Sequence, residues 1–206
     1  MVLAREKLVR KYSGRNALRY DKKRGEQRKW HRENALVRAM TSAVPRGSKV
    51  LDLPCGTGRL FDLWRQRGYD VIGVDISQDM LTLAKKRVKD AEKIKLGQYE
   101  VLTAQELQEN RFDLVACVRL LHLIAESQVA LYVAKLASLL KTGGLMVLTI
   151  QLGPKYRSGS DVATHAEAKF YALLKKLSLK IEQSEKITAA GWRVMSLRKE
   201  GATKRS

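Results

Sequence analysis

The chain has 206 residues, of which 45% are hydrophobic and 30% are charged, a composition typical of a single globular domain. It contains no apolar stretch of the roughly 18 residues that cross a bilayer, and no apolar core of a secretory signal near the N-terminus. Two cysteines are too few for a disulfide scaffold. These features exclude the secreted, membrane-spanning and fibrous classes, and we expect a cytoplasmic protein.

Positive charge is concentrated at the two ends of the chain. Lysine and arginine number 40 against 21 aspartate and glutamate residues, which gives a net charge of +19. Residues 1–49 hold 15 basic and 4 acidic side chains, residues 50–150 hold 13 and 12, and residues 151–206 hold 12 and 5. Such an excess serves solubility in many proteins, but a cationic surface also attracts anionic partners. If the two basic segments, residues 1–49 and 151–206, lie beside the same site in the fold, they therefore indicate an anionic partner.

Two helices are predicted at the N-terminal end. They cover residues 3–12 and 25–44, and the second places Trp30, Leu36 and Ala39 on its apolar side. Because such short helices cannot enclose a core of their own, we expect residues 1–48 to form a basic helical cap on the rest of the chain. Residues 201–206 are predicted to be a basic tail.

From residue 49 onward, apolar strand-like runs alternate with segments of helical periodicity. Alternating strands and helices predict an α/β fold: an open, doubly wound, seven-stranded, mostly parallel sheet with an antiparallel edge strand, helices on both faces and the N-terminal helical cap. The last two strands have no helix between them, which indicates a hairpin. Strands are predicted at 49–53, 69–75, 98–102, 112–119, 145–151, 179–187 and 192–198, and helices at 59–68, 78–91, 127–140 and 167–177.

A glycine loop follows the first of these strands. Residues 52–58 read DLPCGTG, and glycines there let the backbone turn sharply and approach a ligand closely. Asp75 ends the second strand, where a carboxylate can accept hydrogen bonds from both hydroxyls of a ribose. The loop is not followed by Gly-Lys-Ser/Thr, which argues against a triphosphate. The pattern predicts a nucleoside-containing ligand beyond the carboxyl ends of the strands.

Residues 50–58 (VLDLPCGTG), 73–77 (GVDIS), 112–122 (FDLVACVRLLH) and 141–150 (KTGGLMVLTI) stand in a characteristic order and spacing. Together they resemble the motifs of the class I, Rossmann-like, S-adenosylmethionine-dependent methyltransferases. The resemblance implies a methyltransferase enzyme with S-adenosyl-L-methionine as cofactor, bound by a domain at residues 49–200.

The resemblance also implies roles for single residues. Asp52 orients the loop or reaches the methionine amino group, Asp75 holds the ribose hydroxyls, and Ile76 packs on the adenine. Pro54 stands in place of the first glycine of the family pattern. The implied cofactor-binding residues are Asp52, Pro54, Cys55, Gly56, Gly58, Asp75, Ile76, Thr103, Ala104, Cys117 and Arg119.

Methyl transfer from a sulfonium depends mostly on positioning, and a general base is optional. His122 and His165 are the candidate catalytic residues, although an isolated histidine is equally well explained as a hydrogen-bonded structural residue. No His/Cys ligand set surrounds Cys55 or Cys117, so no metal is expected. Candidate substrate-binding residues border the entrance to the site: Tyr20, Arg24, Trp30, His31, Tyr156 and Arg157.

Three interpretations of the acceptor remain open. A small-molecule or lipid-linked anionic acceptor would use a few of the cationic side chains. An RNA substrate would use the whole cap for phosphate contacts. The third interpretation is a cofactor-binding accessory protein without catalytic activity, because a fold alone does not establish function.

Overall fold

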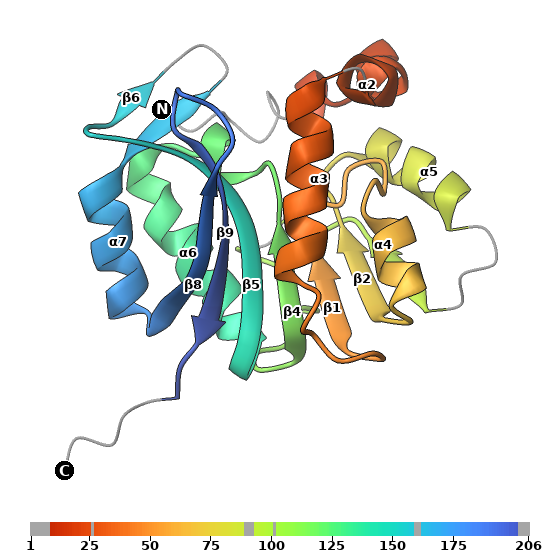
Figure 1. The fold of residues 1–206 in the computed structure, drawn as a ribbon. Coiled ribbons are helices and arrows are strands. Elements are labelled where there is room, and N and C mark those ends of the chain that lie inside the picture. Colours follow the sequence, from red (N-terminus) through yellow and green to blue (C-terminus); the bar gives the residue numbers. More distant parts are fainter. Residues whose placement is uncertain (1–8, 26, 89–92, 101, 159–161, 202–206) are drawn as a thin grey trace.

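A twisted sheet of parallel strands forms the centre of the molecule (Figure 1). The structure is a computed structural model that describes residues 9–25, 27–88, 93–100, 102–158 and 162–201. The five parallel strands stand in the order β3-β2-β1-β4-β5. Their bounds are β1 (Lys49–Asp52), β2 (Asp70–Val74), β3 (Ile94–Gly97), β4 (Phe112–Cys117) and β5 (Leu140–Gly153).

A C-terminal hairpin completes the sheet beside β5. Strand β9 (Trp192–Lys199) runs antiparallel to β5 and also antiparallel to β8 (Leu179–Lys186), which forms the edge. Two short strands, β6 (Arg157–Ser158) and β7 (Ala163–Ala166), extend the far end of β5. The expected α/β fold class, with a mostly parallel sheet and an antiparallel hairpin at one side, is confirmed.

Helices cover both faces of the sheet and enclose two apolar cores. Consecutive side chains of a strand point to opposite faces, so Leu51 packs into one core and Val50 into the other. The first core lies under α6 (Glu126–Leu139), α7 (Glu167–Lys176) and the short η1 (Leu121–Leu123). The second lies under α3 (Arg28–Met40), α4 (Phe61–Gln66) and α5 (Gln78–Arg87).

The N-terminal region differs from the prediction. Helix α2 (Arg15–Gly25) falls where no helix was expected, because Leu18 is exposed and α2 has no long apolar stripe to signal it. The predicted helix at 25–44 is shorter, α3, and most of the predicted helix at 3–12 lies outside the described residues. The backbone N–H of Gly14 donates to Asp79 Oδ2 (2.7 Å), and the Ser77 hydroxyl donates to the Tyr12 carbonyl (2.8 Å). These bonds attach the cap to the start of α5.

The third strand was also predicted in the wrong place. It covers Ile94–Gly97 instead of residues 98–102 and pairs with β2 from Val71 to Val74. Lys93 and Lys95 interrupt the apolar pattern of this segment, which is why the pattern favoured the residues that follow. The consequence is that residues 98–100 form a loop at the carboxyl end of the strand.

Candidate functional site

The glycine loop is held between the ends of three strands. The backbone N–H of Leu53 donates to the Ala116 carbonyl, and that of Cys55 to the Val74 carbonyl, both at 2.8 Å. Gly58 has a φ of 78°, and a Cβ atom there would lie 2.5 Å from the ring of Phe61. Only glycine therefore fits this turn, which lets α4 start directly beneath it.

Asp75 fixes the other side of the loop. Its Oδ2 accepts from the backbone N–H of Gly56 and its Oδ1 from that of Ser77, each at 2.9 Å. Burial raises the pKa of Asp75 to about 6, although the backbone hydrogen bonds from Ser77 and Gly56 oppose this shift. A carboxylate has about four lone-pair sites, so the hydrogen bonds from Gly56 and Ser77 leave Asp75 able to accept from a ligand.

Two cavities meet at this carboxylate. The larger encloses about 620 Å³, part of it open to solvent, and the smaller about 360 Å³. They share Pro54, Asp75, Ile76 and Leu120 and so form one cleft along the carboxyl ends of β1, β2 and β4. The larger cavity is lined by Tyr12, Tyr20, Pro54, Cys55, Gly56, Thr57, Arg59, Asp75, Ile76, Met80, Val118, Arg119, Leu120 and Leu123.

Asp52 lies beneath the cleft and not in its wall. It is fully buried, and its Oδ2 accepts from the indole N–H of Trp64 at 2.9 Å. Burial raises the pKa of Asp52 to about 7, against the effects of the Trp64 hydrogen bond and the Arg59 charge. This geometry agrees with an orienting role better than with direct contact to a ligand.

The smaller cavity contains residues that the sequence analysis missed. Tyr99, Glu100 and Tyr132 line it, and Glu100 Oε1 accepts from the Tyr132 hydroxyl at 3.3 Å. Thr103 and Ala104, which were expected near this end of the ligand, are not among the described lining residues of either cavity. The displaced third strand explains the difference, because it puts Glu100 in the loop that follows the strand.

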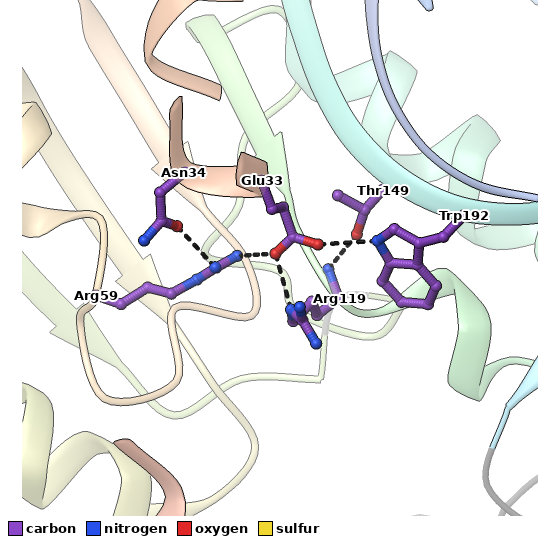
Figure 2. Close-up of polar contacts among 6 residues, drawn as sticks. All are labelled: Glu33, Asn34, Arg59, Arg119, Thr149 and Trp192. Atoms are coloured by element: carbon purple, nitrogen blue, oxygen red, sulfur yellow. Dashed lines mark hydrogen bonds and ion pairs between the residues drawn. The ribbon is translucent and has the colours of Figure 1, made fainter. Parts of the chain in front are cut away.

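The cap contributes a buried carboxylate, Glu33, that contacts two arginines lining the larger cavity (Figure 2). Glu33 Oε1 accepts from Arg59 Nη2 and from Arg119 Nε, both at 2.8 Å, and Oε2 accepts from Trp192 Nε1 at 2.9 Å. Burial alone would raise the pKa of Glu33, but the charges of Arg59 and Arg119 outweigh it and hold the pKa below its usual value. Glu33 is therefore ionised and joins α3, the glycine loop, β4 and β9. We call Glu33, Arg59, Arg119 and Trp192 the Glu33 cluster.

Neither Glu33 nor Arg59 was identified from the sequence, yet one signal was present. Trp30, Glu33, Val37 and Met40 share the buried face of α3, and a carboxylate at helical spacing among apolar residues requires a buried cation. The identity of that cation could not be read from local pattern, because Arg119 is 86 residues away.

The two candidate histidines are buried and are not among the described lining residues of either cavity. His165 Nε2 lies 2.9 Å from the Leu121 carbonyl, so Nε2 carries the proton, and burial lowers the pKa of this ring. His122 packs edge-on against Trp192, with ring centroids 4.7 Å apart.

The candidate substrate-binding residues do not all lie at the same place. Tyr20 lines the larger cavity and packs edge-on against Trp30. His31 is exposed on α3, and Arg24 lies in α2 with its side chain outside the described part of the structure. Tyr156 packs near His165, and the exposed Arg157 lines a separate groove with Lys186 and Arg193.

Both cysteines are free thiols. Cys55 lines the larger cavity, whereas Cys117 is fully buried in the core, and burial raises the pKa of both. Within the described ranges, no three His, Cys, Asp or Glu side chains are grouped as a metal site requires. No described helix is long and apolar enough to cross a membrane.

The geometry can be compared with known proteins. Residues 50–144 match the model of a methyltransferase domain. The ubiquinone biosynthesis O-methyltransferase of Pseudomonas aeruginosa (strain UCBPP-PA14) is 34% identical over 113 residues, 53% of this chain and 47% of that protein. The enzyme of the same name from Alkalilimnicola ehrlichii is 32% identical over 53% of this chain and 44% of its own length. The chain spans about half the length of the curated relatives it matches.

Solved structures extend the likeness to the whole fold. The 1,6-didemethyltoxoflavin-N1-methyltransferase of Burkholderia thailandensis, solved with S-adenosylhomocysteine, has a TM-score of 0.71 at 20% identity and covers 96% of this chain and 87% of its own. The magnesium protoporphyrin IX methyltransferase of Synechocystis PCC 6803, solved with bound cofactor, has a TM-score of 0.75 at 15% identity, with 95% and 97% covered. Residues 50–144 therefore carry the sequence pattern of a methyltransferase domain, and the chain has the fold of methyltransferases solved with S-adenosylmethionine or S-adenosylhomocysteine bound.

Proposed function

We propose that the protein transfers a methyl group from S-adenosylmethionine to an anionic or polar acceptor, either a small molecule or a lipid-linked headgroup. The observation that carries the proposal is Asp75, a carboxylate with unused acceptor capacity at the carboxyl end of β2, beside a glycine loop and between two connected cavities. This is where open parallel sheets bind nucleoside ligands.

The residues of the cleft fit the parts of that cofactor. Asp75 would accept from the ribose hydroxyls, and Ile76 would pack against the adenine ring. Glu100 lies beyond Ile76 in the smaller cavity and can accept from an adenine amino group. Pro54, Cys55 and Gly56 would lie along the other side, with Gly58 shaping the turn beneath and Cys117 behind it. Arg119 lines the larger cavity, where the methionine end and the acceptor would meet.

The proposed mechanism relies on alignment. The cofactor supplies a methyl group on a sulfonium, from which a thioether departs as a good leaving group. The chain's task is therefore to hold the acceptor atom in line with the methyl–sulfur bond and to exclude water. The Trp30 and Trp192 rings and the Tyr12 and Tyr20 side chains would close the acceptor side. His122 and His165 are the proposed bases for an acceptor that must lose a proton.

The acceptor class is supported by the relatives' names. They are described as acting in ubiquinone biosynthesis or on a toxoflavin precursor, which favours a small acceptor here. Residues 1–48 would form the cap over it, and Tyr156 and Arg157 would approach from the other side. The free cysteines fit a reducing, cytoplasmic setting.

RNA is the second candidate, favoured by the exposed cations of the cap. Arg15, Arg19 and Lys22 on α2, and Arg28 and Arg32 on α3, are all exposed. An RNA substrate held by these contacts would bind more weakly as salt rises. A cofactor-binding accessory protein would share the cleft but transfer no methyl group.

Labelled methyl transfer into a fractionated cell extract distinguishes these functions. We expect label from S-adenosylmethionine in the small-molecule or lipid fraction, lost with Asp75→Ala. Label in RNA that is suppressed by salt would contradict the small acceptor and support the RNA candidate. Cofactor binding without label in any fraction would support the accessory protein.

Cofactor binding should depend on pH through Asp75. Its pKa is about 6, and the ionised form accepts hydroxyl hydrogen bonds best. Affinity is therefore full above this value and is lost as the pH falls through it, by up to about tenfold per pH unit. Calorimetric titration with S-adenosylhomocysteine between about pH 8 and about pH 5 measures this.

The matched variant is Asp75→Asn. It should bind S-adenosylhomocysteine weakly, and its affinity should depend less on pH. Asp52, with a pKa of about 7, is the neighbouring group that could also titrate, and Asp52→Asn should keep the dependence on pH. An unchanged profile in Asp75→Asn would contradict the assignment of this proton to Asp75.

A further inference from the structure

Arg119 is held rigidly at the end of β4. Its backbone has a φ of 68°, and its N–H donates to the Thr149 hydroxyl at 2.7 Å. Its Nε donates to Glu33 Oε1 at 2.8 Å, and its side chain is only 9% exposed. A positive φ is uncommon outside glycine, and these bonds show that the fold maintains this geometry to direct the side chain.

Two indole rings flank the guanidinium. The Cζ atom of Arg119 lies 5.2 Å from the Trp30 ring centroid and 5.4 Å from that of Trp192. Both distances are within cation–π range. Glu33 occupies the Nε edge (Figure 2), and the larger cavity borders the residue.

One buried nitrogen of this guanidinium, Nη2, has no hydrogen-bond partner among the described residues. A buried donor without a partner costs free energy, and such a group in an otherwise satisfied site needs an explanation. Arg119 also lines the larger cavity, so a ligand held there is a candidate for the partner that the described residues do not supply.

The local charge points to the sign of that ligand atom. Arg59 and Arg119 bring two positive charges to Glu33, which brings one negative charge. The other described groups bonded to them, Asn34, Thr149 and Trp192, are neutral. Asp75 lines the same cavity, but its oxygens are bonded to Gly56 and Ser77 and to neither guanidinium. The Arg59 charge also acts on the buried Asp52, whose pKa is about 7. Among the described residues, Arg119 is bonded to one carboxylate, Glu33, which it shares with Arg59, and a buried charge that is incompletely paired is costly.

We propose that Arg119 Nη2 binds a carboxylate-type oxygen of a molecule held in the larger cavity, with Glu33, Trp30 and Trp192 fixing the guanidinium for this contact. The proposal rests on the proposed function, since it assumes that the cleft binds cofactor and acceptor. Two molecules can supply this oxygen: the cofactor, through the carboxylate of its methionine part, or the methyl acceptor, through an anionic group of its own.

The first arm of the test compares two nucleosides by calorimetry. S-Adenosylhomocysteine has the carboxylate, whereas 5′-methylthioadenosine lacks the whole amino acid part. If the cofactor supplies the oxygen, Arg119→Gln should lower the affinity for S-adenosylhomocysteine roughly tenfold to a hundredfold, because a hydrogen bond to a charged group is lost. Binding of 5′-methylthioadenosine should be unchanged.

The second arm tests the acceptor as the source. Protein saturated with S-adenosylhomocysteine is titrated with benzoate and followed by tryptophan fluorescence, since Trp30 and Trp192 flank the site. If the acceptor supplies the oxygen, Arg119→Gln should bind benzoate at least about tenfold more weakly while nucleoside binding stays unchanged. Arg65→Gln, which removes an exposed arginine that pairs with the exposed Asp62, is the matched control and should behave as the wild type.

Results that would overturn the anion site differ from results that would contradict the proposed function. The anion site is overturned, and the proposed function stands, if Arg119→Gln and Arg119→Lys bind both nucleosides and benzoate as the wild type does. The same holds if the wild type does not bind benzoate, with or without S-adenosylhomocysteine, and its nucleoside binding does not depend on Arg119. A wild-type protein that binds neither nucleoside contradicts the proposed function itself. Circular dichroism confirms that each variant is folded, and Arg119→Lys serves as the second variant because it retains the charge.

Discussion

Replacing Glu33 by alanine should lower the free energy of unfolding by about 3–5 kcal/mol, the cost of leaving buried charges without their partner. Arg59 and Arg119 would keep their burial and lose their shared carboxylate, and the Trp192 indole N–H would lose its acceptor. Urea unfolding monitored by tryptophan fluorescence measures the change.

Asp62→Ala is the matched control for this prediction. Asp62 also pairs with an arginine at 2.8 Å, but its side chain is 63% exposed, and exposed pairs contribute at most about 1 kcal/mol. Glu33→Gln should lie between the two variants, because the amide oxygen can still accept from Trp192 while the charge is lost. If Glu33→Ala unfolds at the same urea concentration as Asp62→Ala, the cluster does not anchor the cap.

Replacing Asp75 by alanine should weaken binding of S-adenosylhomocysteine by about 1–3 kcal/mol, roughly tenfold to a hundredfold, because hydrogen bonds between the ribose and a charged acceptor are lost. The Gly56 N–H would lose its partner as well, so the glycine loop would be held less firmly. Isothermal calorimetry measures the affinity directly.

Asp70→Ala tests whether the effect is specific to the cleft. Asp70 lies on the same strand, β2, but at the opposite end and exposed. The Asp70→Ala variant should bind S-adenosylhomocysteine with an affinity within about twofold of the wild type, as expected of a surface substitution away from the site. Equal losses in the two variants would show that the effect of Asp75→Ala comes from the strand and not from ribose contacts.

The architecture of the main domain could be predicted because each element carries a local signal. The run VLDL before PCGTG marks β1 and its loop, and Ser77 caps α5 by accepting from the Met80 N–H at 3.3 Å. Alternating strands and helices then restrict the sheet to a few topologies. The cofactor loop and Asp75 followed from that order, since both stand at the carboxyl ends of strands.

The contacts of the cap could not be predicted in the same way. Glu33 and Trp192 are 159 residues apart, and Glu33 and Arg119 are 86 apart. Local periodicity contains no information on such pairs. The exposed helix α2 was missed for a related reason: its stability comes from bonds to α5 through Gly14 and Asp79 and from packing with α3, not from an apolar stripe of its own.

The site was predicted in part. Pro54, Cys55, Gly56, Asp75, Ile76 and Arg119 do come together around the larger cavity, whereas Glu100 was overlooked because residues 98–102 were assigned to a strand. The histidines were chosen for their chemistry. They are not among the described lining residues of either cavity, and burial lowers the pKa of His165. Their roles remain predictions.

The measurement that tests the central claim most directly is a crystal structure of the wild-type protein with S-adenosylhomocysteine. We expect the ribose hydroxyls within hydrogen-bond distance of Asp75, the adenine between Ile76 and Leu120, and the amino acid part running past Gly56 toward Arg119. A nucleoside bound outside this cleft, or a ribose that makes no contact with Asp75, would contradict the account.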